Sequence, residues 1–383
     1  MTDNLSLARG IAPEITALRR DFHRHPELGN RETRTAERIE ACLNGWGIPT
    51  RRLLDTAVVG RLEGGLSGRT AALRADMDAL PLQEATGCDF ASRNPGVMHA
   101  CGHDVHMAAA LGAARLLAAH RQALPGAVVF LFQPDEEGRG GAQRMIEAGA
   151  LEGVDGVFGA HVAPDLPAGC VGVRYGKFYA ASDTFRVIVH GVSAHGATRE
   201  KGVDALGAAA ALVERLIAIP GQMPGETGVL SVGMLHAGSA ENALADRAEF
   251  AGIIRTLGPV ARAGLKRRFR ETVDAVTAAW GATAEVALRE SYPGVVNDDA
   301  MTGLVRRAAT GLLGADRVRV IDAPTMTTED FGYFLEQRPG SFYHIGAGCA
   351  LSLHNTGFLP DAGAVTAAAA VHAAVIEAFL RGE

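Results

Sequence analysis

The 383-residue chain is 48% hydrophobic and 21% charged, a balance typical of a globular protein that buries a core. Its formal net charge of −6 gives no electrostatic reason to expect nucleic acid or an anionic membrane as a partner, and we predict neither. The length predicts two domains, with three as the alternative.

The first 180 residues alternate between helical and strand-like patterns. Helices are expected near 4–20, 31–46, 105–120 and 140–148, and strands at 57–62, 70–74, 127–132 and 156–160. This alternation predicts an α/β domain whose sheet is mostly parallel and is covered by helices on both faces.

The segment 183–291 departs from this alternation. Strands are expected at 184–190, 229–235, 247–256 and 283–290, and helices at 203–218 and 260–280. Their order, β-α-β-β-α-β, is that of ferredoxin-like domains. The α/β pattern then returns with helices near 299–313 and 364–381 and strands near 317–321 and 341–346. We predict one α/β domain, formed by 1–182 and 292–383, that is interrupted by a smaller α+β domain at 183–291.

The cellular location is predicted from cysteine usage and from the N-terminal segment. Five widely spaced cysteines without a C-x-x-C pair are not typical of a disulfide framework, and they favour a reducing compartment. The N-terminal residues do not combine a basic region with an apolar run, and we interpret no stretch as a membrane span. A cytoplasmic protein is expected.

Residues 98–106, MHACGHDVH, are the densest group of potential metal ligands in the chain. Gly102 allows a tight turn, so that Cys101 and His103 can point toward one spot. A thiolate next to an imidazole is a donor set that suits zinc and neighbouring metals. The alternative is a buried cysteine among scattered surface histidines.

Four polar clusters follow predicted strands of the α/β domain. In chain order they are Asp76 with Asp78, Asp135 with Glu136 and Glu137, then His161, and finally His354. Each alone has an ordinary explanation, such as a turn, a helix cap or a hydrogen-bonded core histidine. Because open α/β sheets bind ligands at the carboxyl ends of their strands, we expect the clusters to converge there.

The adjacent carboxylates Glu136 and Glu137 suit metal-assisted hydrolysis. Neighbouring residues that leave a strand point in different directions, so one carboxylate can bind metal while the other takes a proton from water. The alternative is a solvated acidic loop before a helix N-terminus, where carboxylates are favoured in any case.

Three residues of the inserted domain are candidates for substrate contacts. His195 lies among small residues just beyond a predicted strand, where a ligand could approach closely; an ordinary turn histidine is the alternative. Arg255 ends an otherwise apolar strand and could hold a carboxylate with two hydrogen bonds, or it could form a surface ion pair. Asn242 is either a turn residue or a hydrogen-bond donor to substrate.

The motifs together resemble those of peptidase family M20, and in particular the amidohydrolases of its subfamily D, which include hippurate hydrolases and N-acyl-amino-acid amidohydrolases. The matching segments are RADMDALP (74–81), MHACGHDVH (98–106), FQPDEEGRGGAQRMIEAG (132–149), GAHVAP (159–164), GVSAHGA (191–197), IRT (254–256), TTEDFGYF (327–334) and LHNTGF (353–358). They span nearly the whole chain in the expected order.

The resemblance implies a centre of two divalent ions, which could be zinc, manganese, cobalt or nickel. Its implied ligands are Cys101, His103, Glu137, His161 and His354, with Cys101 bridging the two ions. Glu136 is then the general base, and Asp76 and Asp78 orient ligands. His106 lies three residues after His103, but the resemblance does not make it a ligand.

The implied activity is hydrolysis of the amide bond of N-acyl amino acids by a metal-activated water. His195 would stabilise the oxyanion, while Arg255 and Asn242 would receive the carboxylate side of the substrate. The inserted domain would act as a lid and form a homodimer interface across which His195 can act, and a higher homo-oligomer stays open. A dipeptidase or aminopeptidase of the same family, and a non-catalytic metal- or ligand-binding relative, are the alternatives.

The chain departs from the family pattern at a few positions. Asp135 stands where a small residue, often alanine, is usual, and its charge is expected to raise the pKa of Glu136 or to receive a free amine. Leu244 and Ala245 replace the usual Ile-Pro, and Arg199 lies near a usual proline. These changes put the substrate and the lid geometry in question.

Overall fold

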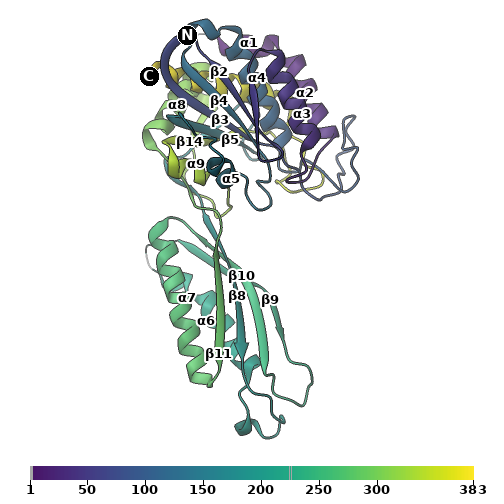
Figure 1. Cartoon of the computed structure of the whole chain (residues 1–383), viewed down its shortest axis with the longest axis vertical. Coiled ribbons are helices and arrows are strands. Elements are labelled where there is room, and N and C mark those ends of the chain that lie inside the picture. The colour runs from purple at the N-terminus through teal and green to yellow at the C-terminus, as the bar shows by residue number, and fades with distance from the viewer. Residues whose placement is uncertain (1–2, 224, 226) are drawn as a thin grey trace. The chain divides into compact units, whose positions relative to one another are not determined.

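The computed structural model describes residues 3–223, 225 and 227–383, which form two compact units (Figure 1). Unit 1 comprises Met1–Gly176, Asn297–Ala323 and Asp330–Glu383, and unit 2 comprises Lys177–Val296 and Pro324–Glu329. The expected insert lies inside unit 2, which extends beyond it at both ends. The return of 324–329 to unit 2 was not predicted; Thr325 N–H donates to the Phe178 carbonyl there, a long-range pairing without a sequence pattern.

Unit 1 contains eight of the described helices and a large sheet. The helices are α1 (Asn4–Gly10), α2 (Ala12–Arg24), α3 (Thr33–Gly45), α4 (His103–Ala119), α5 (Ala142–Glu147), α8 (Asp299–Leu313), α9 (Gly332–Gln337) and α10 (Ala362–Arg381). The strands of its sheet are β1 (Thr50–Leu53), β2 (Ala57–Glu63), β3 (Leu66–Asp76), β4 (Pro125–Gln133), β5 (Gly156–Ala163), β6 (Val171–Val173), β13 (Val318–Val320) and β14 (Gly340–Gly346). Two further strands, β7 (Gly176–Tyr179) and β12 (Val295–Asn297), form a separate small sheet that lies mostly in unit 2.

The large sheet has the strand order β1-β2-β4-β3-β5-β14-β6-β13. Its central strands β4, β3, β5 and β14 run parallel, as the alternating pattern predicted. Every residue of β5 is buried, as expected for a strand covered on both faces. The short strands β1 and β6 were not predicted, because three or four residues carry too little periodicity.

The helix expected near 4–20 is in fact two helices, α1 and α2. They meet at Ile11, and Pro13 lies in the first turn of α2. Proline has no N–H to donate and its ring crowds the preceding turn, so a continuous helix is disfavoured while a new helix start is not.

Helix α10 corrects the expectation that no stretch could span a membrane. It is 20 residues long with a mean hydropathy of 1.7, enough by length and composition alone. However, 78% of that window is buried inside the structure. A Cβ added at Gly112 of α4 would lie 2.7 Å from the Cβ of Ala369 in α10, so small apolar residues here allow close helix packing.

Unit 2 has the predicted β-α-β-β-α-β order (Figure 1). Its elements are β8 (Ala181–His190), α6 (Ala205–Ala218), β9 (Gly228–Ala237), β10 (Arg247–Thr256), α7 (Pro259–Trp280) and β11 (Thr283–Glu290). The antiparallel sheet has the order β11-β8-β10-β9. Both helices contact this sheet and bury apolar side chains such as Leu212 and Phe269 in a core of its own.

Candidate metal centre

The predicted polar clusters of unit 1 converge at the carboxyl ends of neighbouring strands. Asp76 is the last residue of β3, and Glu136 and Glu137 follow β4. His161 was expected just after a strand, but β5 continues to Ala163, so the strand itself presents this side chain. The strand-end geometry therefore brings together residues that are far apart in sequence.

Several sets of three side chains place one possible ligand atom each within 4.8 Å of one another. These sets are Cys101 with His103 and His161, Cys101 with Glu137 and His354, His103 with Glu136 and Glu137, and Asp76 with His103 and His106. Among these four sets, His103 belongs to three, and Cys101 and Glu137 each belong to two. Such a chain of overlapping sets can hold two ions side by side.

The turn between Cys101 and His103 requires glycine, as the sequence predicted. Gly102 has φ +84° and immediately precedes α4. A Cβ at this position would also lie 2.4 Å from Cγ2 of Val162. Any other residue would strain the backbone and displace β5, so Gly102 sets the relative placement of the thiol and the imidazole.

Two histidines are oriented by backbone carbonyls. His103 Nδ1 lies 2.8 Å from the Asp78 carbonyl, and His161 Nδ1 lies 2.8 Å from the Val162 carbonyl. Because a carbonyl only accepts, each Nδ1 carries the proton, which leaves Nε2 as a lone-pair donor. His161 Nε2 faces Cys101 Sγ at 3.3 Å, and His103 Nε2 is buried without a hydrogen-bond partner among the described residues. These orientations fit metal ligands.

His106 has no free lone pair. Its Nε2 accepts the Val162 N–H at 2.9 Å, and its Nδ1 donates to Asp76 Oδ1 at 2.6 Å. The imidazole ring of His106 thus links β5 to β3 through hydrogen bonds. This geometry is consistent with the omission of His106 from the ligands that the resemblance implies.

The turn after β4 is organised by Asp78. One oxygen of its carboxylate accepts the Glu136 N–H at 3.1 Å and the other accepts the Glu137 N–H at 2.9 Å. The Glu137 side chain meets His354, whose Nε2 lies 3.0 Å from Glu137 Oε1. His354 has φ +61° and its N–H donates to the Ala100 carbonyl at 2.9 Å, so a late loop is joined to the 98–106 motif.

The charges at the centre favour a bound cation. Burial, together with the charge of Glu137, raises the pKa of the Cys101 thiol. Burial alone would lower the pKa of His103, but the carboxylates of Asp76 and Asp78 raise it to about 10. Burial thus favours the neutral thiol, while nearby carboxylates favour a positive charge at His103, and binding of a divalent ion would displace the protons of both groups.

A buried ion network behind Asp76 was missed by sequence reasoning. Arg74, fully buried, donates to Asp76 Oδ2 at 2.6 Å, to Asp330 Oδ1 at 2.9 Å and to Gln133 Oε1 at 2.9 Å. Asp330 also accepts the Ala142 N–H at the start of α5. Arg74 and Asp330 lie within matched motifs, but their pairing spans 256 residues and leaves no local pattern.

The three candidates for substrate contacts, His195, Asn242 and Arg255, all lie in unit 2. His195 is exposed, and its Nδ1 accepts the Ala197 N–H at 3.1 Å, which leaves Nε2–H free to donate. Asn242 is its close neighbour, because its carbonyl accepts the Gly196 N–H at 2.8 Å. The side chain of Arg255, in β10, is half-buried and makes no hydrogen bond or ion pair with the described part of the chain, although the charge of Asp183 acts on it.

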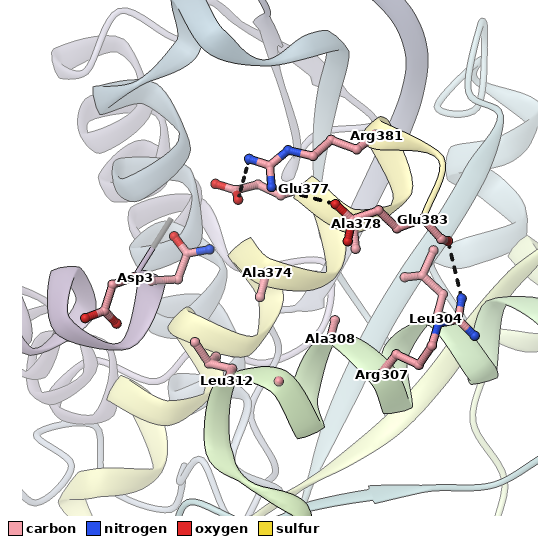
Figure 2. A pocket seen from close by; sticks show the side chains of 12 residues that line it. Asp3, Leu304, Arg307, Ala308, Leu312, Ala374, Glu377, Ala378, Arg381 and Glu383 are labelled. Carbon is pink, nitrogen blue, oxygen red and sulfur yellow. Dashed lines mark hydrogen bonds and ion pairs between the residues drawn. The ribbon is translucent and has the colours of Figure 1, made fainter. Parts of the chain in front are cut away.

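A cavity of about 410 Å³ between α1, α8 and α10 contains none of these residues (Figure 2). Its two guanidinium groups already have partners within the wall. Arg381 pairs with Glu377 Oε2 at 3.1 Å, and Arg307 donates to a main-chain oxygen of Glu383 at 3.3 Å. Both guanidinium groups thus already have partners in the wall of the cavity.

Comparison with known proteins assigns the family. The sequence profile of peptidase family M20/M25/M40 matches residues 72–378. The chain belongs to peptidase family M20. Its membership makes it a hydrolase of amide bonds, and the resemblance of the motifs is confirmed.

Three similar proteins are informative. An N-acetyl-L-cysteine deacetylase of Bacillus subtilis is 39% identical over 359 residues, covering 93% of this chain and 85% of the relative. Thermostable carboxypeptidase 1 of Saccharolobus solfataricus is 36% identical over 383 residues, covering 97% of this chain and 96% of the relative. The crystal structure of a B. subtilis protein described as a dinuclear metal-binding peptidase of the M20 family matches with a TM-score of 0.88 and 34% identity, covering 97% of this chain and 99% of that one.

Proposed function

We propose that this M20 hydrolase cleaves the amide bond of N-acyl amino acids at a centre of two divalent ions. The observation that carries the proposal is the pair of three-ligand sets that share Cys101, with Glu136 beside them. The sets supply sulfur, nitrogen and carboxylate oxygen, which suit zinc and also admit manganese, cobalt or nickel. The five free cysteines support a reducing, cytoplasmic location.

The ligand roles follow from the geometry of each donor. Cys101, shared by two sets, would bridge the ions. His103 and His161 would each offer Nε2, and Glu137 and His354 would complete the second set. Asp76 and Asp78 would orient these ligands through His106, His103 and the main chain.

Glu136 is the residue that moves the proton. Its side chain is buried beside the ligand sets, while its main chain is held by Asp78. When bound, the ions supply Lewis-acid activation of the amide carbonyl and of a water molecule. Glu136 accepts the proton of the attacking water and then delivers it to the leaving nitrogen, which departs as a neutral amine.

His195 is proposed to donate to the developing oxyanion. Since its Nδ1 already accepts the Ala197 N–H, the neutral ring carries its proton on Nε2. A preorganised N–H donor of this kind stabilises charge that develops in the transition state. Asn242, next to it, offers an exposed amide for the same end of the substrate.

Arg255 is proposed to bind the carboxylate of the amino-acid part. Its guanidinium is half-buried and forms no hydrogen bond within the described part of the chain, and burial lowers its pKa although the charge of Asp183 raises it, so an anion that binds here would stabilise the buried charge. The substrates named for the two curated relatives suggest which anion: an N-acetyl amino acid and a peptide cut at its carboxyl end both release an amino acid with a free α-carboxylate. A carboxypeptidase activity is therefore the second candidate.

The Arg255→Ala variant is expected to lose about 2–3 kcal/mol of transition-state stabilisation, the range for a charge-assisted hydrogen-bonded pair. This corresponds to a fall of roughly 30- to 150-fold in kcat/KM on N-acyl amino acids. The matched carboxamides, which lack the anion, should lose far less. Equal losses on acids and carboxamides would show that Arg255 has a structural role.

Unit 2 is proposed to form a homodimer through β9. This strand is the edge of its sheet and exposes Val229, Met234 and Leu235. Edge strands with apolar side chains tend to pair with another chain. At micromolar concentration, analytical ultracentrifugation should show a dimer for the wild type and a monomer for Leu235→Glu, with Leu66→Glu of unit 1 as the control. A monomeric wild type with full activity would exclude both the dimer and the action of His195 across it.

One experiment tests the activity itself. The protein is stripped with a chelator, reloaded separately with zinc, manganese, cobalt or nickel, and assayed on hippurate, N-acetyl amino acids, dipeptides and longer peptides. We expect metal-dependent release of amino acid that is fastest from N-acyl amino acids. Faster release from peptides with a free carboxyl end would favour the carboxypeptidase, and release that requires a free amino end would favour a dipeptidase or aminopeptidase.

A further inference from the structure

The turn that carries Glu136 and Glu137 begins with an unusual residue. Asp135 has φ +60°, a left-handed conformation that is uncommon for residues other than glycine. Its carbonyl accepts the Gly140 N–H at 3.0 Å, which closes the turn. The conformation of Asp135 therefore decides the direction in which the next two side chains leave β4.

Three consecutive N–H groups of this turn are accepted by buried carboxylates from elsewhere in the chain. Asp78 takes those of Glu136 and Glu137, and Glu32 Oε1 takes that of Asp135 at 3.0 Å. Glu32 is fully buried, and its other oxygen accepts the hydroxyl of Thr56 at 2.9 Å. The turn is thus held from two sides, once by the loop after β3 and once by the segment before α3.

The carboxylate of Asp135 is itself held by three groups, whose contacts together form the Asp135 clamp. Its Oδ2 accepts Asn30 Nδ2 at 2.6 Å and the Arg139 N–H at 3.3 Å, and it lies 3.5 Å from Arg144 Nη1. Arg144 also donates to Asn30 Oδ1 at 2.7 Å, which closes a ring of three side chains. The carboxylate is therefore engaged, which disfavours the earlier idea that Asp135 receives the free amine of a substrate.

The surroundings leave no room for side chains at two glycines that face Asp135. A Cβ at Gly29 or at Gly138 would lie 2.2 Å from Asp135 Oδ1. Gly29 precedes Asn30 in the same loop, so both the hydrogen bonds and the space around Asp135 depend on the segment between α2 and α3. This segment lies about a hundred residues before the turn that it contacts.

We propose that Asn30, Glu32 and Asp135 are positioning residues for the metal centre. They would hold the Glu136–Glu137 turn so that one carboxylate reaches the ions and the other reaches the water. The proposal rests on the proposed function only for the roles of those two glutamates. Displacing a catalytic group by about 1 Å can cost about a hundredfold in rate, and loosening an outer support typically costs about 10- to 100-fold in metal affinity.

A double-mutant cycle between Asn30 and Asp135 tests the clamp. Asp135→Ala should lower kcat by roughly 10- to 100-fold with KM changed less than about threefold, because positioning and not substrate binding is lost. Asn30→Ala should have a smaller effect alone and almost none when Asp135→Ala is already present. Asp135→Asn, which accepts from Asn30 and tolerates the left-handed conformation, should recover most of the loss.

Metal retention supplies a readout that does not need hydrolysis. The rate at which a chelator removes metal from the loaded protein should rise in Asp135→Ala and in Glu32→Ala, and return toward the wild-type rate in Asp135→Asn. Asn44→Ala, which removes only an exposed hydrogen bond to Thr50, is the matched control and should change neither readout. Melting temperatures confirm that each variant is folded under assay conditions.

The outcomes separate the two proposals. A wild type that hydrolyses no N-acyl amino acid would contradict the proposed function. The positioning role of Asn30, Glu32 and Asp135 would then be tested by metal retention alone. If Asp135→Ala kept its metal as long as the wild type, and if its kcat, where measurable, equalled that of the wild type, the positioning role of Asp135 would be contradicted. Additive effects of Asn30→Ala and Asp135→Ala on kcat would also contradict the proposal. If the two residues act through one shared interaction, the second substitution has little left to remove.

Discussion

Replacing Glu136 by glutamine is expected to lower kcat by about two to four orders of magnitude while metal content stays at the wild-type level. The amide of glutamine is nearly the same size as the carboxylate, but it cannot accept a proton at neutral pH. The main-chain contact of residue 136 with Asp78 is kept, so the turn is expected to persist. Steady-state kinetics and elemental analysis of the same preparation give both quantities.

The control for this variant is Glu63→Gln, a change of the same kind at an exposed side chain of β2. It should leave kcat, KM and metal content unchanged. If Glu136→Gln hydrolysed substrate at nearly the wild-type rate, the proton would have to move through another group. If it instead lost its metal, Glu136 would be a ligand and its role would have to be exchanged with that of Glu137.

Removing the thiol of Cys101 is expected to disrupt both metal positions at once. Elemental analysis should find up to two ions per wild-type chain and clearly fewer in Cys101→Ala. The loss of affinity should exceed the roughly 10- to 100-fold that is typical for removing an outer-shell partner, because a direct ligand shared by two sets is lost. Hydrolysis should fall in proportion to the metal that is lost.

Cys170→Ala is the matched control, since Cys170 is also buried and free but is not one of the proposed ligands. It should keep its metal and its activity. A metal-free wild type with full hydrolase activity would contradict the proposed centre. Zinc added back to stripped wild type, but not to Cys101→Ala, should restore hydrolysis if the thiol is a ligand.

The sequence by itself determined the elements whose signals are local. The apolar periodicity of 203–218 and 247–256 predicted α6 and β10 nearly to the residue, and the order of elements in 183–291 predicted a ferredoxin-like unit. Residue chemistry predicted which side chains could bind metal, because thiols, imidazoles and paired carboxylates at turns are informative without coordinates. Gly102 could likewise be identified, since only glycine suits the turn between Cys101 and His103.

Only the tertiary structure decided which further side chains support the centre besides Asp76 and Asp78. It gave His106, already left out of the implied ligands, a role through two hydrogen bonds, and it connected Arg74 to Asp330 across 256 residues. Asp135, interpreted from the sequence as a charge beside the base, is instead engaged by Asn30 and Arg144. The physical reason is the same in each case: a hydrogen bond between segments far apart in the chain depends on how they pack, and packing across such separations leaves no periodicity or spacing in the sequence.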